Sequence, residues 1–364
     1  MQTPRQVIDS LLRKKPADRV GFHDWPWPDT LKGWVRQGYP VDDKGEPADF
    51  ATHFGTDMLD VGAYFNHYPR KEIYELIEET DEWHVHRDGW GASLKLWKNR
   101  SGVPEHVDFH MVTREIWEKD YRGRLLELDT RRFKIQETKE NLARRKAQGG
   151  WTHYGHGFVF ETMRQSMGDI CLCESMLLDP EWIVDFNETL TNFFQMHYRY
   201  LFEQAGLPDG MWFFEDLGYK QRLFCSPDLY RRMIFPYYKR MVDFYHSYNL
   251  PVVLHTCGLV EPILDLIVEA GFDGLHPMEV KAGNDPLRIA AKYKDKLALV
   301  GGLDARILES HDPALIRAKV GELIDGMKSL GASYIFASDH SLSTNVRYAD
   351  FQAAVEEYRR RSEY

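Results

Sequence analysis

The chain has 364 residues, of which 43% are hydrophobic and 28% are charged, a composition typical of a globular protein with a large core. Its net charge of −10 disfavours nucleic acids and anionic membranes as partners, because an acidic surface does not attract them. Four cysteines are too few for a disulfide framework in a chain of this length, so we expect reduced thiols and a cytoplasmic location.

The first twenty residues predict an amphipathic helix with Val7, Ile8, Leu11 and Leu12 on one face. This segment lacks the continuous apolar stretch of a signal peptide, and no apolar run in the chain is long enough to cross a bilayer. Residues 1–150 are otherwise less regular than the rest. We predict three strands in the first half of the chain, at Arg19–His23, Met58–Ala63 and Gly155–Phe160.

Two further segments of the first half have recognisable patterns. Trp83–Trp97 alternates polar and apolar residues around Asp88-Gly89, which predicts a hairpin inserted over the mouth of the fold. Leu125–Gln148 is charged and helical, and we expect it to lie over the outside.

The second half alternates short apolar runs with helical periodicity, which is typical of a parallel sheet with helices between its strands. Five strands are predicted, at Met211–Phe214, Val252–His255, Gly274–His276, Leu297–Gly301 and Tyr334–Ser338. The predicted helices cover Pro227–Asn249, Val260–Ala270, Pro286–Tyr293, Pro313–Leu330 and Tyr348–Arg361. With the three earlier strands the total is eight, so we expect an α/β fold, a (β/α)₈ barrel forming one domain over residues 1–364.

Chemically active side chains follow each of the last five predicted strands. They are Glu215, Asp216, His255, Cys257, Glu279, Asp304, Asp339 and His340. In a barrel the carboxyl ends of the strands meet at one face, so these side chains would converge there. This clustering predicts an active site.

His255 and Cys257 stand two residues apart at the end of a strand, so both side chains can face the same side. Imidazole nitrogen and thiolate sulfur are half of a tetrahedral zinc site. The third ligand stays open among His340, Glu215, Asp216 and Glu279. The alternative is a hydrogen-bonded histidine and a small apolar cysteine in the core.

Other polar residues admit both a structural and a functional interpretation. Glu215 and Asp216 are adjacent, so one enters the barrel and the other caps the helix or loop behind it. Asp339 and His340 suit proton transfer, although Asp339 could also cap a helix. Weaker candidates near the second strand are His53, Asp57 and Asp60. After the first strand, His23, Trp25 and Trp27 could line the cleft or seal it.

Several segments together resemble the uroporphyrinogen decarboxylase superfamily: PADRVGF, FEDLGYKQRLFCSPDLYRRMIFPYYKRM, VVLHTCG, HPMEVKAGNDP, LVGGLD and ASDHSLS. The resemblance runs from about Ala17 to the C-terminus and implies a (β/α)₈ barrel. The superfamily contains cofactor-free decarboxylases of tetrapyrroles. It also contains methyltransferases that pass methyl groups between corrinoid proteins or small donors and a zinc-bound thiol.

The decarboxylase branch is matched only in part. Asp57, in GTDML, resembles its catalytic aspartate, and His340 resembles its late histidine. Its paired arginines, which bind a substrate with many carboxylates, have no counterpart, and only Arg36 lies close.

The methyltransferase branch supplies the HxCG motif, matched by His255 and Cys257, and a later cysteine whose place His340 takes here. The resemblance therefore implies Zn²⁺ bound by these three residues, and acids at Glu215, Glu279 and Asp304. We expect a zinc- or corrinoid-linked methyltransferase acting on a small methylated or methoxylated molecule, with a corrinoid protein as partner. The alternatives are a cofactor-free decarboxylase that uses Asp57, and a ligand-binding barrel without catalysis. The oligomeric state stays open.

Overall fold

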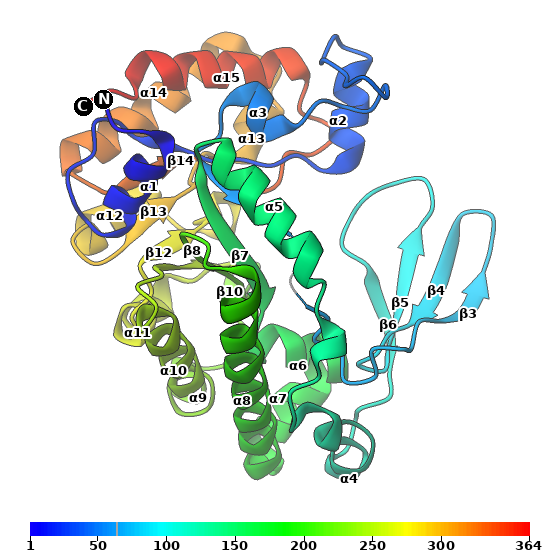
Figure 1. Ribbon diagram of the computed structural model, residues 1–364. Helices are drawn as coiled ribbons and strands as arrows, with labels where there is room; N and C mark the ends of the chain where they lie inside the picture. Colours follow the sequence, from blue (N-terminus) through cyan, green and yellow to red (C-terminus); the bar gives the residue numbers. More distant parts are fainter. Residues whose placement is uncertain (63–64) are drawn as a thin grey trace.

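The computed structural model describes residues 1–62 and 65–364, and its centre is a sheet of eight parallel strands surrounded by helices (Figure 1). Neighbouring strands follow the order β1-β14-β13-β12-β11-β8-β7-β2, which is the order of a (β/α)₈ barrel, as predicted. The strands are β1 (Gly21–Phe22), β2 (Met58–Asp60), β7 (Trp151–Gly157), β8 (Gly210–Phe214), β11 (Val252–His255), β12 (Gly274–His276), β13 (Ala298–Val300) and β14 (Tyr334–Phe336).

Asp57 closes the ring between β1 and β2. Its backbone nitrogen donates to the carbonyl oxygen of Phe22 at 2.8 Å, and its side chain accepts a hydrogen bond from the Phe22 nitrogen at 2.8 Å. Arg19 binds both carboxylate oxygens of Asp57 at 2.7 Å. Asp57 precedes β2 and therefore lies toward the amino ends of the strands, where this ion pair joins the two edges of the sheet.

The predicted strands are found with changed ends. Val252–His255 and Gly274–His276 match to the residue. The strand predicted at Gly155–Phe160 is β7, which begins four residues earlier, at Trp151. It also ends earlier, at Gly157, because Val159 and Phe160 already belong to the helix that follows. The strand predicted at 58–63 ends at Asp60, and the end expected for it, Ala63, lies outside the described residues.

The N-terminal helix α1 (Pro4–Leu12) is capped by Thr3, which forms a capping box with Gln6. The apolar face predicted for it is buried: Val7, Ile8, Leu11 and Leu12 are at most 2% exposed. This face packs in one cluster with interior side chains of the strands, including Met58, Trp151, Trp212, Val253, Ala298, Val300 and Ile335. The helix therefore closes one end of the barrel and leaves the carboxyl ends of the strands for the site.

The outer helices follow the predicted pattern, with three ranges matched to the residue: α12 (Pro286–Tyr293), α14 (Pro313–Leu330) and α15 (Tyr348–Arg361). The others are α2 (Pro28–Val35), α3 (Phe50–Phe54), α4 (Arg114–Ile116), α5 (Ile135–Ala147), α6 (Val159–Met167), α7 (Asp169–Leu178), α8 (Pro180–Ala205), α11 (Leu264–Ala270) and α13 (Ala305–Leu308). No helix in the described part of the chain is long and apolar enough to span a bilayer.

The single helix predicted over Pro227–Asn249 is divided into α9 (Pro227–Met233) and α10 (Phe235–His246). Pro236 lies at the start of α10 and has no N–H to donate to the preceding turn. Ile234 between the two helices has φ −118°, whereas a regular helix has φ of about −63°. The proline therefore ends α9 and begins α10.

The hairpin predicted at Trp83–Trp97 is present as β4 (Trp83–Arg87) and β5 (Ala92–Trp97). It belongs to a four-stranded antiparallel sheet that adds β3 (Glu75–Glu79) and β6 (Glu105–Phe109). β5 and β6 contact α6, which follows the carboxyl end of β7, so the sheet lies toward the end of the barrel where the insertion was expected (Figure 1). A second small hairpin, β9 (Gly218–Tyr219) with β10 (Arg222–Leu223), follows β8.

Candidate metal centre and adjoining pockets

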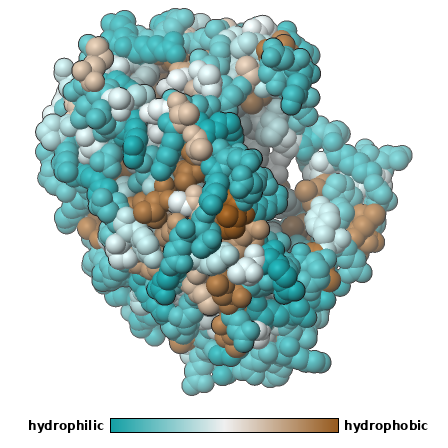
Figure 2. All heavy atoms as spheres, viewed as in Figure 1, coloured by the Kyte–Doolittle hydropathy of each residue, from teal (hydrophilic) through white to brown (hydrophobic). Residues whose placement is uncertain are grey.

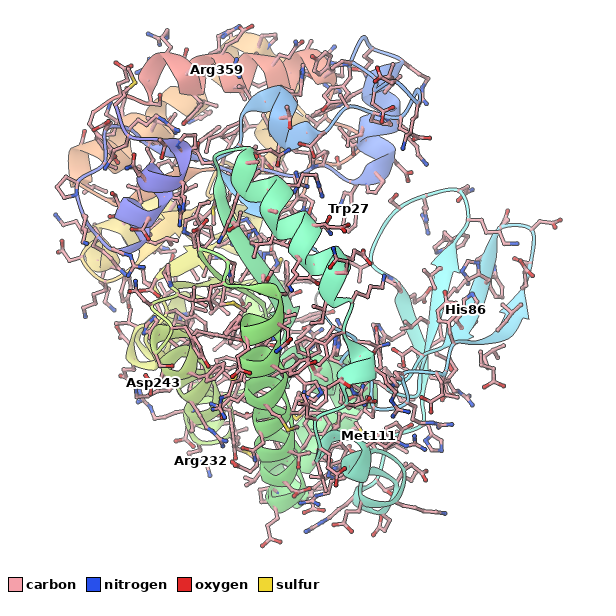
Figure 3. All side chains as sticks on the ribbon, viewed as in Figure 1. Trp27, His86, Met111, Arg232, Asp243 and Arg359 are labelled. Carbon is pink, nitrogen blue, oxygen red and sulfur yellow. The ribbon has the colours of Figure 1, made fainter. Side chains whose placement is uncertain are left out.

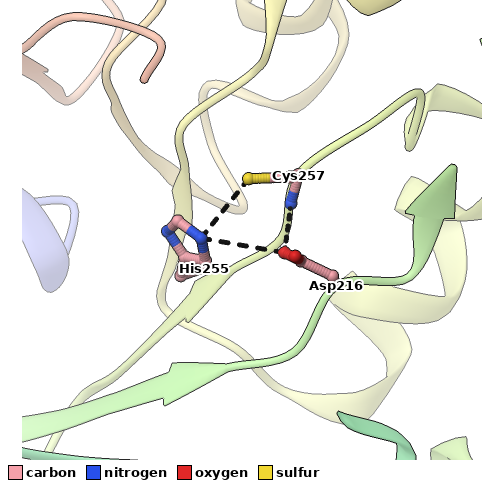
Figure 4. A group of neighbouring side chains, drawn as sticks. All are labelled: Asp216, His255 and Cys257. Carbon is pink, nitrogen blue, oxygen red and sulfur yellow. Dashed lines mark hydrogen bonds and ion pairs between the residues drawn. The ribbon is translucent and has the colours of Figure 1, made fainter. Parts of the chain in front are cut away.

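Asp216, His255 and Cys257 meet at the carboxyl ends of β8 and β11 (Figure 4). The Sγ atom of Cys257 lies 3.5 Å from Nε2 of His255, and Oδ1 of Asp216 lies 3.7 Å from the same nitrogen. One ligand atom from each residue lies within 4.8 Å of the others. They form the one such group of acids, histidines and cysteines found among the described residues.

Backbone contacts between the two loops hold this group together. The Cys257 nitrogen donates to Oδ1 of Asp216 at 2.9 Å, and the Gly218 nitrogen donates to the Cys257 carbonyl oxygen at 3.2 Å. Gly258 has φ +76°, and a Cβ on it would lie 2.4 Å from the carbonyl carbon of Gly218. Only glycine permits this close approach, so the HxCG sequence brings its histidine and cysteine against the loop that carries Asp216.

The three side chains fit a zinc ion. A tetrahedral zinc with Zn–S and Zn–N bonds of about 2.3 and 2.0 Å holds those two ligands about 3.5 Å apart. Burial, with the carboxylates of Asp216 and Glu279, raises the pKa of the Cys257 thiol well above its usual value. Burial lowers the pKa of His255, which keeps its imidazole neutral and able to act as a ligand. A divalent cation would offset the repulsion between the two carboxylates and a thiolate.

Glu215 and Asp216 point to opposite sides, as predicted for adjacent residues. Glu215 is fully buried and accepts hydrogen bonds from the backbone nitrogens of Phe158, Phe160 and Glu161 and from the hydroxyl of Tyr238. Burial raises the pKa of Glu215 to about 8. Its carboxyl group therefore caps the N-terminus of α6 and does not join the metal group.

The other predicted strand-end residues lie in loops near the group. Glu279 accepts from the Gly258 nitrogen at 2.6 Å, and Asp339 accepts from the nitrogens of neighbouring loops at residues 280 and 305. Asp304 caps α13 and pairs with Arg306. His340 is outside the metal group, and its Nδ1 lies 3.3 Å from the Ser341 carbonyl oxygen. The side chain that lies with His255 and Cys257 is therefore Asp216, one of the four candidates for the third ligand, and not His340.

The residues predicted near β2 do not converge on the metal group. Both oxygens of Asp57 are taken by Arg19, toward the other end of the barrel, which argues against the catalytic role expected for it. His53 bonds the Tyr348 hydroxyl at 2.9 Å. Of the three candidates, Asp60 lies at the carboxyl end of its strand, with its carboxylate 3.9 Å from Nδ1 of His153.

A largely apolar pocket of about 540 Å³ lies against Trp25 and Phe214, two residues whose rings contact that of His255. Its lining includes the candidates His23 and Trp25, together with His153 and Phe214. The rings of Trp25 and Phe214 lie 6.1 and 5.7 Å from the His255 ring between centroids. Figure 2 shows the surface hollowed between the part that carries α2 and the four-stranded sheet, and Figure 3 places Trp27 and His86 on its two sides. The third aromatic candidate, Trp27, is the residue that precedes α2.

A second cavity, of about 960 Å³, reaches Asp216 from the side of α6, α7 and β6. Two of its residues, Glu161 and Arg164, were not predicted from the sequence. Arg164 donates to Glu161 at 2.8 Å and to the Asp216 carbonyl oxygen at 3.4 Å. Burial raises the pKa of Glu161 to about 7, and the Asp216 carboxylate adds to the shift. The assignment of residues 155–160 to a strand hid this turn of α6.

His276 is the other residue that the prediction missed. It is 5% exposed, and its Nδ1 lies 2.7 Å from Nδ1 of His255 on the neighbouring strand. Its signal was present, because GLH ends a predicted strand with histidine just as VVLH does.

The chain resembles known proteins both in sequence and in fold. The sequence model of the family described as uroporphyrinogen decarboxylase (URO-D) matches residues 171–361, just over half of the chain, whereas no curated protein matches it. A solved methyltransferase from Methanosarcina mazei aligns over 99% of both chains at 15% identity, and its TM-score of 0.69 shows a shared fold. Xylanase B from Clostridium stercorarium F9 aligns over 64% of this chain and 86% of its own, at 11% identity and a TM-score of 0.38. By the family match, the chain belongs to the uroporphyrinogen decarboxylase (URO-D) family.

Proposed function

We propose that this protein is a methyltransferase that binds Zn²⁺ through Asp216, His255 and Cys257. The observation that carries the proposal is the approach of these three side chains to ligand distance at the mouth of the barrel. The fold shared with a methyltransferase over the whole chain supports it. Three protein ligands leave one position of a tetrahedral ion open, as in catalytic zinc sites.

Zn²⁺ held by Asp216, His255 and Cys257 would lower the pKa of a substrate thiol, which would release its proton to solvent and become a nucleophile. The sulfur would form a bond to the methyl carbon, and the electron pair of the broken donor–methyl bond would stay with the donor. The chain's own residues position the reactants: Trp25 and Phe214 flank His255 and form an apolar wall for a small methylated or methoxylated compound. The wider cavity beside Asp216 would admit a methyl donor carried by a corrinoid protein.

The cofactor-free decarboxylase is the less supported alternative. Among the residues that line the pocket beside His255, Arg145 is the one guanidinium, and it is paired with Asp49 at 3.2 Å. A polycarboxylate substrate needs unpaired guanidinium groups. Asp57, expected to be catalytic in that reaction, is bound to Arg19.

Metal analysis of the purified protein tests the zinc site. We expect about one zinc per wild-type chain and loss of zinc from His255→Ala and Cys257→Ala. The matched controls are His53→Ala and Cys225→Ala, whose side chains lie outside the metal group and should leave the zinc content unchanged. Zinc that is substoichiometric and equal in all variants contradicts the site.

Turnover separates the three functions. The zinc-loaded protein is incubated with a thiol acceptor and a panel of methyl donors that includes methylcobalamin, and the products are read by mass. A mass gain of one methyl group on the thiol, absent in Cys257→Ala, supports methyl transfer. Loss of carbon dioxide from uroporphyrinogen without metal supports the decarboxylase, and no product with any donor supports a binding barrel.

A further inference from the structure

His276 lies on the far side of His255 from the metal group. His255 and His276 are paired in register at the ends of β11 and β12, with their Nδ1 atoms 2.7 Å apart. The other ring nitrogen of His255, Nε2, faces Cys257 and Asp216. Nε2 of His255 therefore faces the metal group, and Nδ1 of His255 shares a hydrogen bond with His276.

Two ring nitrogens at this distance share a single proton, so one histidine donates and the other accepts. If His276 donates, the neutral His255 carries its own proton on Nε2, and that nitrogen has no lone pair for a metal. If His255 donates, its Nε2 is free. Metal ligation thus requires that His276 accept the hydrogen bond.

The surroundings of His276 suit such a fixed acceptor. Its ring packs against Trp212 and Trp25, with centroids 5.0 and 5.5 Å apart, and against His23 at 6.0 Å. These contacts hold the ring plane in place. Histidine ligands of metals are commonly oriented by a group bonded to the second ring nitrogen, and removal of that group weakens metal binding by about 10–100-fold.

We propose that His276 is a positioning residue, which accepts the hydrogen bond of His255 and so presents Nε2 of His255 to the metal. The inference rests on the proposed zinc site. It assigns His276 no contact with metal or substrate, and its effect passes through the tautomer and orientation of His255.

Zinc affinity of the full-length protein, measured by competition with a chelator after metal removal and reloading, tests this role. His276→Leu removes the acceptor and should weaken zinc binding by about 10–100-fold. His276→Asn places an acceptor oxygen on the same branch as Nδ1, so we expect its affinity to return to within about threefold of the wild type. The control His197→Leu removes a buried histidine of α8 outside the metal group.

Cobalt gives a readout that does not depend on activity. The sulfur-to-cobalt absorption band should shift or weaken in His276→Leu and match the wild type in His276→Asn, while the melting temperatures are recorded beside it. Equal zinc affinity in His276→Leu and the wild type overturns the positioning role and leaves the zinc site standing. An asparagine variant as weak as the leucine variant also overturns it. A wild-type protein without zinc affinity overturns both proposals.

Discussion

The backbone nitrogen of Cys257 donates a hydrogen bond to Oδ1 of Asp216 over 2.9 Å. The backbone of one proposed metal ligand, Cys257, thus holds the side chain of another, Asp216, although the two residues follow different strands of the barrel. The carboxylate is held near Nε2 of His255 before any metal arrives, which reduces the ordering required on binding.

Asp216 can be tested by a pair of substitutions. Asp216→Asn keeps an oxygen that accepts from Cys257 but loses the negative charge, whereas Asp216→Ala loses both. We expect zinc affinity to fall in the order wild type, asparagine, alanine, with the alanine variant weaker by about 100-fold or more. Chelator competition measures it, with Asp304→Asn as the control outside the group. Unchanged affinity in Asp216→Ala would show that another residue is the third ligand.

We predict that the ion pair between Asp57 and Arg19 stabilises the folded state. The Asp57 side chain is 1% exposed, so Asp57→Asn leaves the Arg19 guanidinium without its charge partner and should lower the free energy of unfolding by about 3 kcal/mol. Urea denaturation measures the change, and Asp9→Asn, which alters the more exposed pair with Arg13, is the control. The zinc content of folded protein should not change. A stable variant that has lost only turnover would restore Asp57 as a catalytic candidate.

Glu215 makes stability depend on pH. Its pKa is about 8 in the folded chain and near 4.5 when exposed, so between these values the folded state binds more protons than the unfolded state. Stability that comes from Glu215 is therefore present at low pH and falls as pH rises toward 8, by at most about 1.4 kcal/mol per pH unit. Glu215→Gln should remove this slope in denaturation curves recorded from pH 5 to 8, whereas the exposed Glu75→Gln should not. Parallel curves for the wild type and Glu215→Gln would contradict the assignment.

Helix α1 closes the amino end of the barrel, and Ile8 is one of its fully buried side chains. Ile8→Ala should lower the free energy of unfolding by about 2–5 kcal/mol, because it leaves a cavity against the strands. The control is Lys15→Ala, at an exposed position just after α1. Metal content at the opposite end should be unchanged in folded Ile8→Ala, and loss of zinc from it would show that the two ends are coupled.

The sequence alone predicted the residues that local pattern controls. Alternating apolar runs and helical periodicity identified eight strands, and the two-residue spacing of His255 and Cys257 placed both at one site. The start of α6 at Val159 was missed because apolar residues at a strand end and at a helix start look alike in sequence. The break at Pro236 was missed because helical spacing continues across it from Met233 to Tyr237.

Only the tertiary structure decided which polar groups meet. Whether Asp216 or His340 completes the group depends on how loops from different strands pack, and neither loop carries a pattern that reports it. The same holds for His276, which reaches His255 across a strand pair, and for Asp57, which joins Arg19 at the seam of the ring. Periodicity is a property of one segment, whereas a site is made by distances between segments, and the closure of the barrel sets those distances.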